Sequence, residues 1–106
     1  MIRAEFYRSG SERLKGFRLS GHAGLAEYGQ DIACASVSSA VMLTANTLTE
    51  AFKIDAEVRV EENVISLKLG IDESGQGDKL LLGLLTHLYF LSDEFQGRIK
   101  ITFTEV

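Results

Sequence analysis

The sequence predicts an α+β fold, in which a single mixed, mainly antiparallel sheet of about five strands has two long helices packed on one face. Three observations support this prediction. Five short segments alternate apolar and polar residues as strands do, two longer segments repeat apolar residues every three or four positions, and no regular strand–helix–strand repeat is present. The expected order is ββαββαβ. A length of 106 residues, 45% of them hydrophobic, suits a single domain over residues 1–106.

The first two strands are expected to form a β-hairpin. Ile2, Ala4 and Phe6 would share one face of the first strand, and Phe17 and Leu19 would share one face of the second. A Ser-Gly-Ser-Glu turn lies between these two segments. Such residues are typical of turns, so the two strands should pair directly.

A glycine-rich loop is predicted for residues 21–30. This segment contains Gly21, Gly24 and Gly29 and shows no apolar period. Because glycine adopts backbone conformations that other residues avoid, the loop should be mobile or unusually shaped.

The first helix is expected to begin with Asp31, a favoured N-cap residue, and to run to about Lys53. Most of its other positions are small or polar, which leaves one apolar face. The residues on that face are spaced three or four apart: Val37, Val41, Ala45, Leu48 and Phe52.

The C-terminal half repeats the pattern of hairpin and helix. Alternation predicts strands over residues 57–61 and 65–69, and a last strand over residues 99–104. A helix is expected over about residues 79–95, with Asp78 as its cap.

That second helix is apolar nearly all round. One sheet cannot cover every side of such a helix, so a second contact surface is expected, either the first helix or a partner subunit. A homodimer would provide the partner. The apolar residues concerned are Leu80, Leu81, Leu82, Leu84, Leu85, Leu88, Tyr89, Phe90 and Leu91.

Charge and hydropathy exclude some classes of partner. Lys and Arg total 11 and Asp and Glu total 15, a formal net charge of −4, so direct binding to nucleic acid is not expected. The longest apolar run, residues 80–91, is shorter than the roughly 20 residues that a bilayer requires, so no membrane contact is expected. The alternating N-terminus lacks the apolar core of a signal peptide, and the one cysteine cannot form an intrachain disulfide. Both features favour a cytoplasmic location.

The single cysteine, Cys34, has two interpretations. A free cysteine among small residues is commonly a buried apolar side chain. If Asp31 caps the helix, however, Cys34 lies in the first helical turn, where unpaired N–H groups and the helix dipole stabilise a thiolate. The same N–H groups would then be candidate donors to the oxyanion of an acyl-transfer reaction.

A histidine at the start of the glycine-rich loop, His22, is the candidate partner of Cys34. A loop of this length can fold back and place the imidazole over the helix N-terminus. The imidazole would accept the thiol proton, or hold the thiolate as an ion pair, and later protonate the leaving amine. The other histidine, His87, lies on the leucine-rich helix, where a core or interface role is expected.

The segment from Gly21 to Ser38 reads GHAGLAEYGQDIACASVS. It resembles the signature of the ribosomal-processing cysteine proteases of bacteria, G-H-A-x-x-A-x-x-G-x-D-I-x-C-A-x-x-S, and matches every fixed position. Chain length and the order of elements also agree with that family over essentially all 106 residues.

The resemblance implies a homodimeric cysteine endopeptidase without a cofactor. Members of the family remove a short N-terminal extension from large-subunit ribosomal protein twenty-seven before or during ribosome assembly, and they cut at a short motif that contains phenylalanine. Carried over residue by residue, the nucleophile is Cys34 and the general base is His22.

Asp31 and Ser38 also match fixed positions of the signature, and their roles stay open. Asp31 would cap the helix, orient His22, or do both. Ser38, one helical turn after Cys34, would bond near the thiol or satisfy a backbone carbonyl. The glycine-rich loop would either close over an extended peptide or be static. Tyr28 in that loop would either contact an aromatic side chain of the substrate or pack internally.

Three other functions fit parts of the sequence. A non-enzymatic assembly or interaction module would have an inert Cys34 and would use its apolar second helix as the partner surface. A zinc site would need Cys34, His22 and Asp31 as ligands, but this set lacks a repeated ligand spacing, so no metal is expected. A thiol redox sensor would need a second copy of Cys34 across a dimer axis, because no other cysteine is present.

Overall fold

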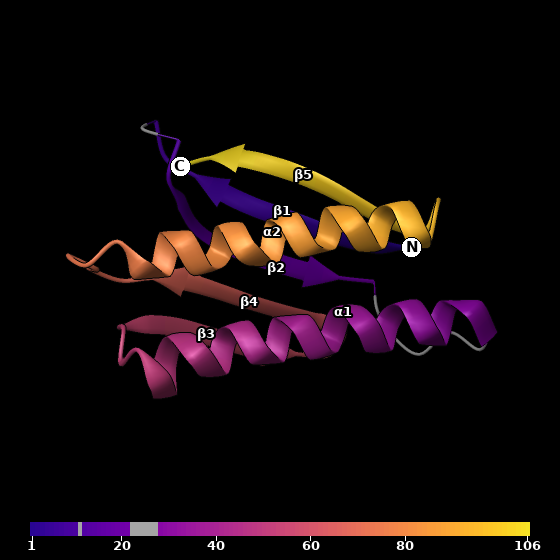
Figure 1. Cartoon of the computed structure of the whole chain (residues 1–106), viewed down its shortest axis with the longest axis horizontal. Coiled ribbons are helices and arrows are strands. Elements are labelled where there is room, and N and C mark those ends of the chain that lie inside the picture. Colours follow the sequence, from indigo (N-terminus) through magenta and orange to yellow (C-terminus); the bar gives the residue numbers. More distant parts are fainter. Residues whose placement is uncertain (11, 22–27) are drawn as a thin grey trace.

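The computed structural model describes residues 1–10, 12–21 and 28–106, and over residues 28–31 it describes the backbone alone. The observed order of elements, ββαββαβ, confirms the predicted order (Figure 1). The first helix continues without a break into a short π-helical segment, η1. The elements are β1 (Ile2–Arg8), β2 (Leu14–Ser20), α1 (Tyr28–Asn46), η1 (Thr47–Ala51), β3 (Ala56–Glu61), β4 (Val64–Leu69), α2 (Gln76–Glu94) and β5 (Ile99–Glu105).

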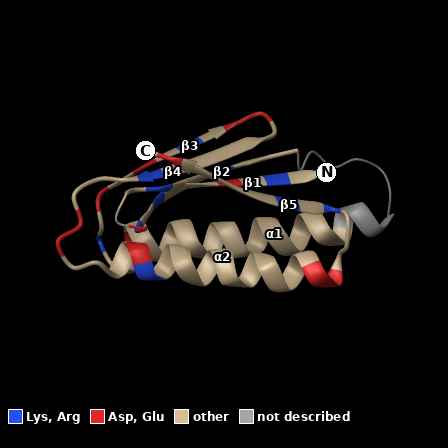
Figure 2. Cartoon of the chain, turned by 90° about the horizontal axis from the view of Figure 1, so that it is seen from above, with Lys and Arg blue, Asp and Glu red and all other residues tan. Residues whose placement is uncertain are grey.

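The five strands form one sheet in the order β3-β4-β2-β1-β5. The pair β1–β5 is parallel and the other three pairs are antiparallel, so the sheet is mixed and mainly antiparallel, as predicted. Both helices lie on the same face of the sheet (Figure 2). The strand β3 is one edge of the sheet and pairs only with β4.

The core lies between the sheet and the two helices, because strand alternation points every second side chain toward them. Phe6 of β1 pairs in register with Phe17 of β2 and with Phe103 of β5. The rings of Phe6 and Phe17 are tilted against each other, 6.2 Å apart. The buried cluster contains Ile2, Ala4, Phe6, Leu14, Phe17, Leu19, Ala33, Cys34, Val37, Val41, Ala45, Leu48, Ile65, Leu67, Leu81, Leu84, Leu85, Leu88, Leu91 and Ile99.

The first helix begins earlier than the sequence predicts. It starts at Tyr28, so Asp31 lies inside the helix and the predicted N-cap role of Asp31 is wrong. An N-cap needs non-helical backbone angles, which a residue inside a helix does not have. Tyr28 and Gly29 therefore belong to α1 and not to the predicted loop. A single glycine costs a helix only about 1 kcal/mol, and nothing in this segment forces the helix to begin later.

The start of α2 also differs from the prediction, because Ser74 and Asp72, and not Asp78, accept hydrogen bonds from its first backbone N–H groups. The Gln76 N–H donates to the Ser74 hydroxyl at 3.1 Å. Gly75, with φ of 72°, precedes the helix, and the Asp72 carboxylate accepts a hydrogen bond from the Gly77 N–H at 2.8 Å. It also accepts bonds from the N–H of Ser74 at 3.1 Å and from its hydroxyl. These bonds, that of the Ser74 hydroxyl foremost, lower the pKa of Asp72.

Asp78 instead joins α2 to the first hairpin. Its carboxylate accepts a hydrogen bond from the Leu14 N–H at 2.6 Å, and it lies 3.9 Å from the Arg13 guanidinium. The predicted cap is therefore wrong, because this side chain is used for a contact between elements distant in the sequence. A capping residue and a tertiary contact residue look identical in one sequence, since both are an aspartate near the start of a helix.

One helical stretch, Ile32–Ala51, is long and apolar enough to cross a membrane by length and composition, with a mean hydropathy of 1.3 over 20 residues. This stretch was not predicted, because the expectation about membranes rested on residues 80–91 alone. Core helices of globular proteins meet the same criterion. Here 39% of the stretch is buried, and Val37, Val41 and Leu48 belong to the buried cluster shared with the strands.

Candidate active site

The only cysteine, Cys34, lies on α1 with a free thiol and is 8% exposed. Because α1 begins at Tyr28, Cys34 sits nearly two turns into the helix. The prediction that placed it in the first turn is wrong. At this depth the Cys34 N–H is paired within the helix, and the effect of the helix dipole has declined. Neither one therefore stabilises the Cys34 thiolate as it would in the first turn. The same change removes the Cys34 N–H as a candidate oxyanion donor.

Cys34 begins a row of side chains along one flank of α1. Residues four apart in a helix share a face, so Cys34, Ser38 and Met42 follow one another along the axis. The residues of α1 that face α2, among them Ala40 and Thr44, lie on the opposite flank. The thiol therefore borders the flank of α1 that faces β4 and β3.

A hollow of about 240 Å³ lies beside Ser38 and Met42 of this row, and Cys34 is not among the residues that line it. We call it the strand-side hollow. Its walls come from α1, from β2 and from both strands of the second hairpin. The lining residues are Leu19, Ser38, Val41, Met42, Val60, Glu61, Val64 and Ile65.

Ser38 lines this hollow and shares the flank of α1 with Cys34, four residues earlier. Ser36 and Thr44 each donate a side-chain hydrogen bond to the carbonyl four residues earlier, at 3.0 and 2.8 Å. Within the described part of the chain, no such bond is recorded for the Ser38 hydroxyl. Its half-buried side chain therefore lies beside the hollow, one turn from the thiol.

The predicted base, His22, and Gly24 lie outside the described residues, and so do the side chains of Tyr28 and Asp31. The chain leaves β2 through Gly21 and is described again from the first residue of α1. At this end of the sheet Ser20 pairs with Val64, next to the strand-side hollow. The proposed zinc ligands and the gating of the loop are not tested, because both depend on these residues.

Gly21 has a structural requirement of its own. Its φ is +80°, in the left-handed region that favours glycine. A Cβ atom here would also collide with the carbonyl oxygen of Met1. A side chain at this position would therefore strain the backbone where the chain leaves β2.

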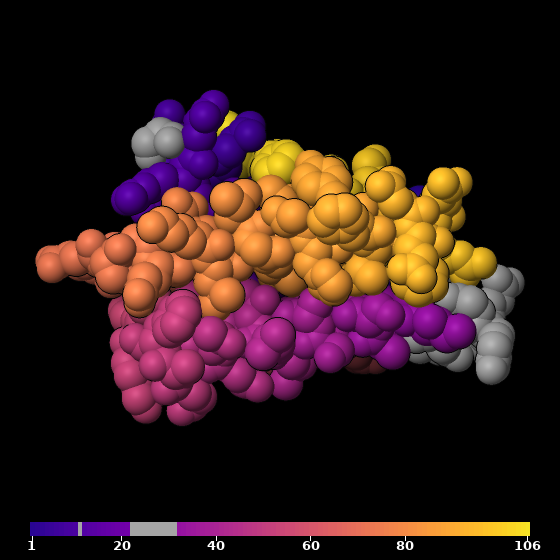
Figure 3. Space-filling model, in the orientation of Figure 1, coloured from indigo at the N-terminus to yellow at the C-terminus, as the bar shows by residue number. Residues whose placement is uncertain are grey.

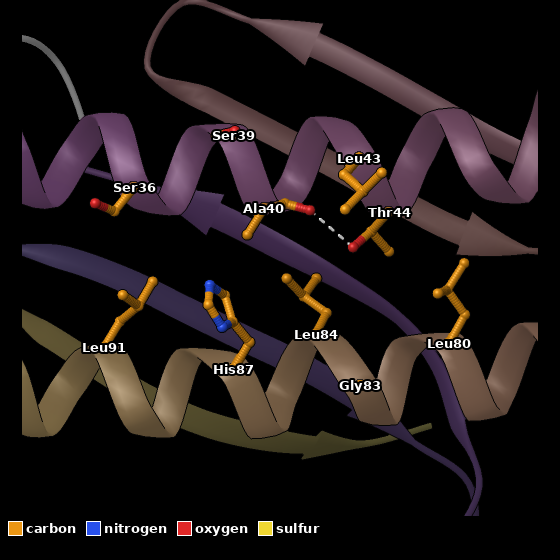
Figure 4. A pocket seen from close by; sticks show the side chains of 10 residues that line it. All are labelled: Ser36, Ser39, Ala40, Leu43, Thr44, Leu80, Gly83, Leu84, His87 and Leu91. Atoms are coloured by element: carbon orange, nitrogen blue, oxygen red, sulfur yellow. Dashed lines mark hydrogen bonds between the residues drawn. The ribbon is translucent and has the colours of Figure 1, made fainter.

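A second and larger hollow, of about 550 Å³, lies between α1 and α2 on the side away from the sheet. We call it the helix-side groove. Figure 3 shows the two helices side by side on this face, and Figure 4 shows the His87 ring pointing from α2 toward α1 between Leu84 and Leu91. His87 is exposed, so of its two expected roles the core role is wrong and the interface role stays a prediction, and Cys34 does not line the groove.

Met42 and Val60 are residues of the site that the sequence analysis missed. Met42 follows Cys34 by two steps of four residues, and this spacing would have indicated the shared flank. Val60 is an apolar residue on an edge strand, 74% exposed. Nothing in its local sequence links it to α1, because Val60 and Met42 come together at the hollow only through the packing of α1 on the second hairpin.

Comparison with known proteins identifies the family to which this fold and its free thiol belong. Residues 1–100 match the family model described as cysteine protease Prp. The chain belongs to this family. It is 26% identical over 108 residues to the ribosomal processing cysteine protease Prp of Bacillus subtilis (strain 168), with 96% of each chain covered.

Solved structures share the fold. Prp from S. aureus, in complex with a substrate peptide, superimposes with a TM-score of 0.90 at 17% identity and covers 98% of this chain and 100% of its own. SMU.848 from Streptococcus mutans gives a TM-score of 0.86 at 24% identity over 100% of this chain and 96% of its own. These comparisons confirm the α+β fold and the predicted class, a cysteine protease.

Proposed function

We propose that this protein is a cysteine endopeptidase that removes a short N-terminal extension from large-subunit ribosomal protein twenty-seven during ribosome assembly. The match of residues 1–100 to the Prp family is the observation that carries the proposal. The Bacillus subtilis relative is named a ribosomal processing protease, and the S. aureus relative holds a substrate peptide, which supports a peptide substrate. In this proposal residues 1–106 act as one protease domain.

The proposed mechanism uses Cys34 as nucleophile and His22 as general base. The imidazole accepts the thiol proton, and the sulfur attacks the scissile carbonyl carbon to form a C–S bond. The C–N bond then breaks, and the imidazolium gives its proton to the departing amine. Water, deprotonated by the same imidazole, attacks the thioester, releases the carboxylic acid product and restores the thiol. No cofactor or metal takes part.

Asp31 and Ser38 have supporting roles in this scheme. The sequence suggested two roles for Asp31, capping the helix and orienting His22. Because Asp31 lies within α1 and is not its cap, the proposal keeps the orientation of His22. Ser38 lies one turn from the thiol, beside the strand-side hollow, where its hydroxyl would contact the bound peptide. The part of the predicted loop that precedes α1, with Gly21 and Gly24, would close over that peptide, whereas Tyr28 and Gly29 belong to the first turn of α1.

A homodimer through the apolar second helix also belongs to the proposal. Leu82, Tyr89 and Phe90 of α2 are exposed, as is Leu43 of α1. Figure 2 shows the charged residues of the helix pair near its ends and none along the middle. Such a surface suits a second copy of the chain better than water. We place the protein in the cytoplasm, where its free thiol stays reduced.

The test is incubation with the extended ribosomal protein of the same bacterium, followed by intact mass. The native chain should release a defined N-terminal fragment, and Cys34→Ala and His22→Ala should not. His87→Ala is the matched histidine control and should retain cleavage. If the native chain leaves the precursor whole, the proposed substrate is wrong. If Cys34→Ala cleaves normally, Cys34 is not the nucleophile and the proposed mechanism is wrong.

A further inference from the structure

The face of the sheet that turns away from α1 and α2 carries a line of basic side chains. Both helices pack on the opposite face, and none of the described elements covers this one (Figure 2). We call it the open face. Four exposed cations lie on it, one from each of four strands, and we call them the basic diagonal: Lys100 of β5, Arg3 of β1, Arg18 of β2 and Lys68 of β4.

The strand register places these four residues on a line that crosses the sheet. Arg3 is the direct partner of Lys100 in the β1–β5 pair. Arg18 lies one strand further and two residues along, and Lys68 repeats the same step on β4. Neighbouring strands are about 4.8 Å apart and two residues along a strand cover about 6.7 Å, so the diagonal spans about 20 Å between its end Cα atoms.

The acidic residues of the open face do not neutralise the basic diagonal. The Glu5 carboxylate accepts a hydrogen bond from the Thr104 hydroxyl. Glu57 and Glu61 lie on the edge strand β3, where Glu57 pairs with Arg59 at 2.7 Å. Within the described part of the chain, no ion pair is recorded for any member of the basic diagonal. Its charges are therefore available to an anion from outside.

Arg3 and Lys100 repel each other in the free protein. Their Cα atoms are partners on neighbouring strands, and like charges in directly opposite positions destabilise a sheet. An anion bound between the two side chains would remove this repulsion. The pair therefore indicates a ligand with negative charge.

We propose that the open face binds the phosphate backbone of single-stranded RNA along the basic diagonal. The choice of RNA rests on the proposed function, because RNA is the anion that surrounds a ribosomal protein during assembly. Tyr7 gives a second reason. Its half-buried ring lies on the open face, with the Lys68 Nζ 5.8 Å from the ring centroid. Proteins that bind single-stranded RNA on a sheet stack bases on such aromatic side chains.

The net charge of the chain, −4, led us to expect no nucleic acid. A net charge averages over the whole surface, whereas the fold separates the charges. Acidic residues gather at the two ends of α2, where Figure 2 shows them on the helix side: Asp72 and Glu73 before the helix, and Asp93 and Glu94 at its end. The open face can therefore attract phosphate although the chain is acidic, and binding should be weak and independent of base sequence.

The experiment measures binding of the full chain to a labelled twelve-nucleotide uridine RNA by fluorescence anisotropy, over a fourfold range of monovalent salt. Each phosphate contact to a single strand adds about 0.7 to the slope of log Kd against log salt. Three or four contacts along the diagonal predict a slope of about 2.1–2.8. Kd should therefore rise about 20- to 50-fold over the salt range.

Single variants assign the binding to the open face. Arg3→Gln and Arg18→Gln should each raise Kd at least about fivefold and lower the salt slope by about 0.7. Lys79→Gln, at an exposed cation on α2, is the matched control and should keep Kd within about twofold. Arg3→Gln also removes the repulsion with Lys100, so its thermal denaturation midpoint should not fall below that of the native chain.

A change at Tyr7 separates stacking from charge. Tyr7→Leu keeps an apolar side chain but removes the ring, and it should raise Kd at least about fivefold. The salt slope should stay unchanged, because stacking releases no counterions. A twelve-residue polyglutamate carries negative charge without bases, and it should bind at least about tenfold more weakly than the RNA.

Three results would overturn the proposal. They are no binding of the RNA at the lowest salt, binding that Arg3→Gln and Arg18→Gln leave unchanged, and polyglutamate binding as tight as that of RNA. The last result would mean that an acidic protein surface occupies the open face. Cleavage of the ribosomal precursor is measured separately. A chain that binds RNA and leaves the precursor whole refutes the proposed substrate, whereas a chain that cleaves without binding RNA refutes the open-face proposal alone.

Discussion

The two helices have the same length and lie on the same face of the sheet, yet their sequences have opposite character. Small side chains such as Ala35, Ser38, Ser39 and Ala40 occupy much of α1, whereas leucine dominates α2. Leucines fill the space between α2 and the sheet. Small residues on α1 leave a hollow on each flank, one beside the second hairpin and one beside α2. In our proposal α1 supplies the chemistry, and α2 supplies the core and the subunit contact.

The largest expected effect is on α1. Cys34→Ser keeps a side chain of similar shape but replaces the thiol with a hydroxyl, which is a much weaker nucleophile near neutral pH. We expect kcat/KM for cleavage of the ribosomal precursor to fall at least about 10³-fold. Ser36→Ala, on the opposite flank of the same helix, is the control and should change kcat/KM by less than about twofold. Activity of Cys34→Ser within tenfold of the native value would exclude Cys34 as the nucleophile.

The second effect concerns the core side of α2. Leu88 is fully buried beneath the helix pair, so Leu88→Ala leaves a cavity and should lower the free energy of unfolding by about 2–5 kcal/mol. Leu82, on the exposed side, is the matched position, and Leu82→Ala should cost less than about 1 kcal/mol in dilute protein. Urea denaturation measures both. Equal losses would mean that α2 is covered on both sides under the conditions used.

A third, smaller effect separates the subunit surface from the peptide site. Phe90 is 69% exposed on α2, and Phe90→Glu would place a charge in the proposed homodimer contact. We expect the dimer dissociation constant to rise at least about tenfold in analytical ultracentrifugation. Val60→Lys, at the strand-side hollow, should leave the constant unchanged. A dimer that tolerates Phe90→Glu would use another surface.

The sequence predicted the elements well and their starts poorly, for different physical reasons. Strands and helices show their period directly, as in the alternation of Ile2, Ala4 and Phe6. A helix start depends on which groups bind its first N–H groups, and the sequence offered Asp31 and Asp78. Asp31 instead lies within α1, and Asp78 binds the first hairpin.

The candidate site was predictable only in part. Cys34 and Ser38 lie four residues apart on one helix, so their shared flank could be read from the sequence. The strand-side hollow could not, because it joins Leu19 of β2, Met42 of α1 and Val60 of β3, which meet only in the folded chain. Its shape depends on how closely α1 approaches the second hairpin, and no local pattern records that distance.

The smallest effect tests the start of α2, where the Asp72 carboxylate accepts a hydrogen bond from the Gly77 N–H. The pKa of Asp72 is lowered in the folded protein, chiefly by the Ser74 hydroxyl and then by the Gly77 N–H. Its carboxylate therefore stabilises the fold fully above the unfolded value of about 3.9, and this stabilisation is lost as pH falls through the lower folded value. Asp72→Asn should be less stable than the native chain at pH 7, with a difference that shrinks in this acidic range. Urea denaturation between pH 7 and pH 3 measures it, and Glu73→Gln, at the adjacent exposed carboxylate, is the control. A difference that stays constant down to pH 3 would mean that the Asp72 hydrogen bonds do not depend on its charge, and that the start of α2 is fixed by backbone geometry at Gly75 alone.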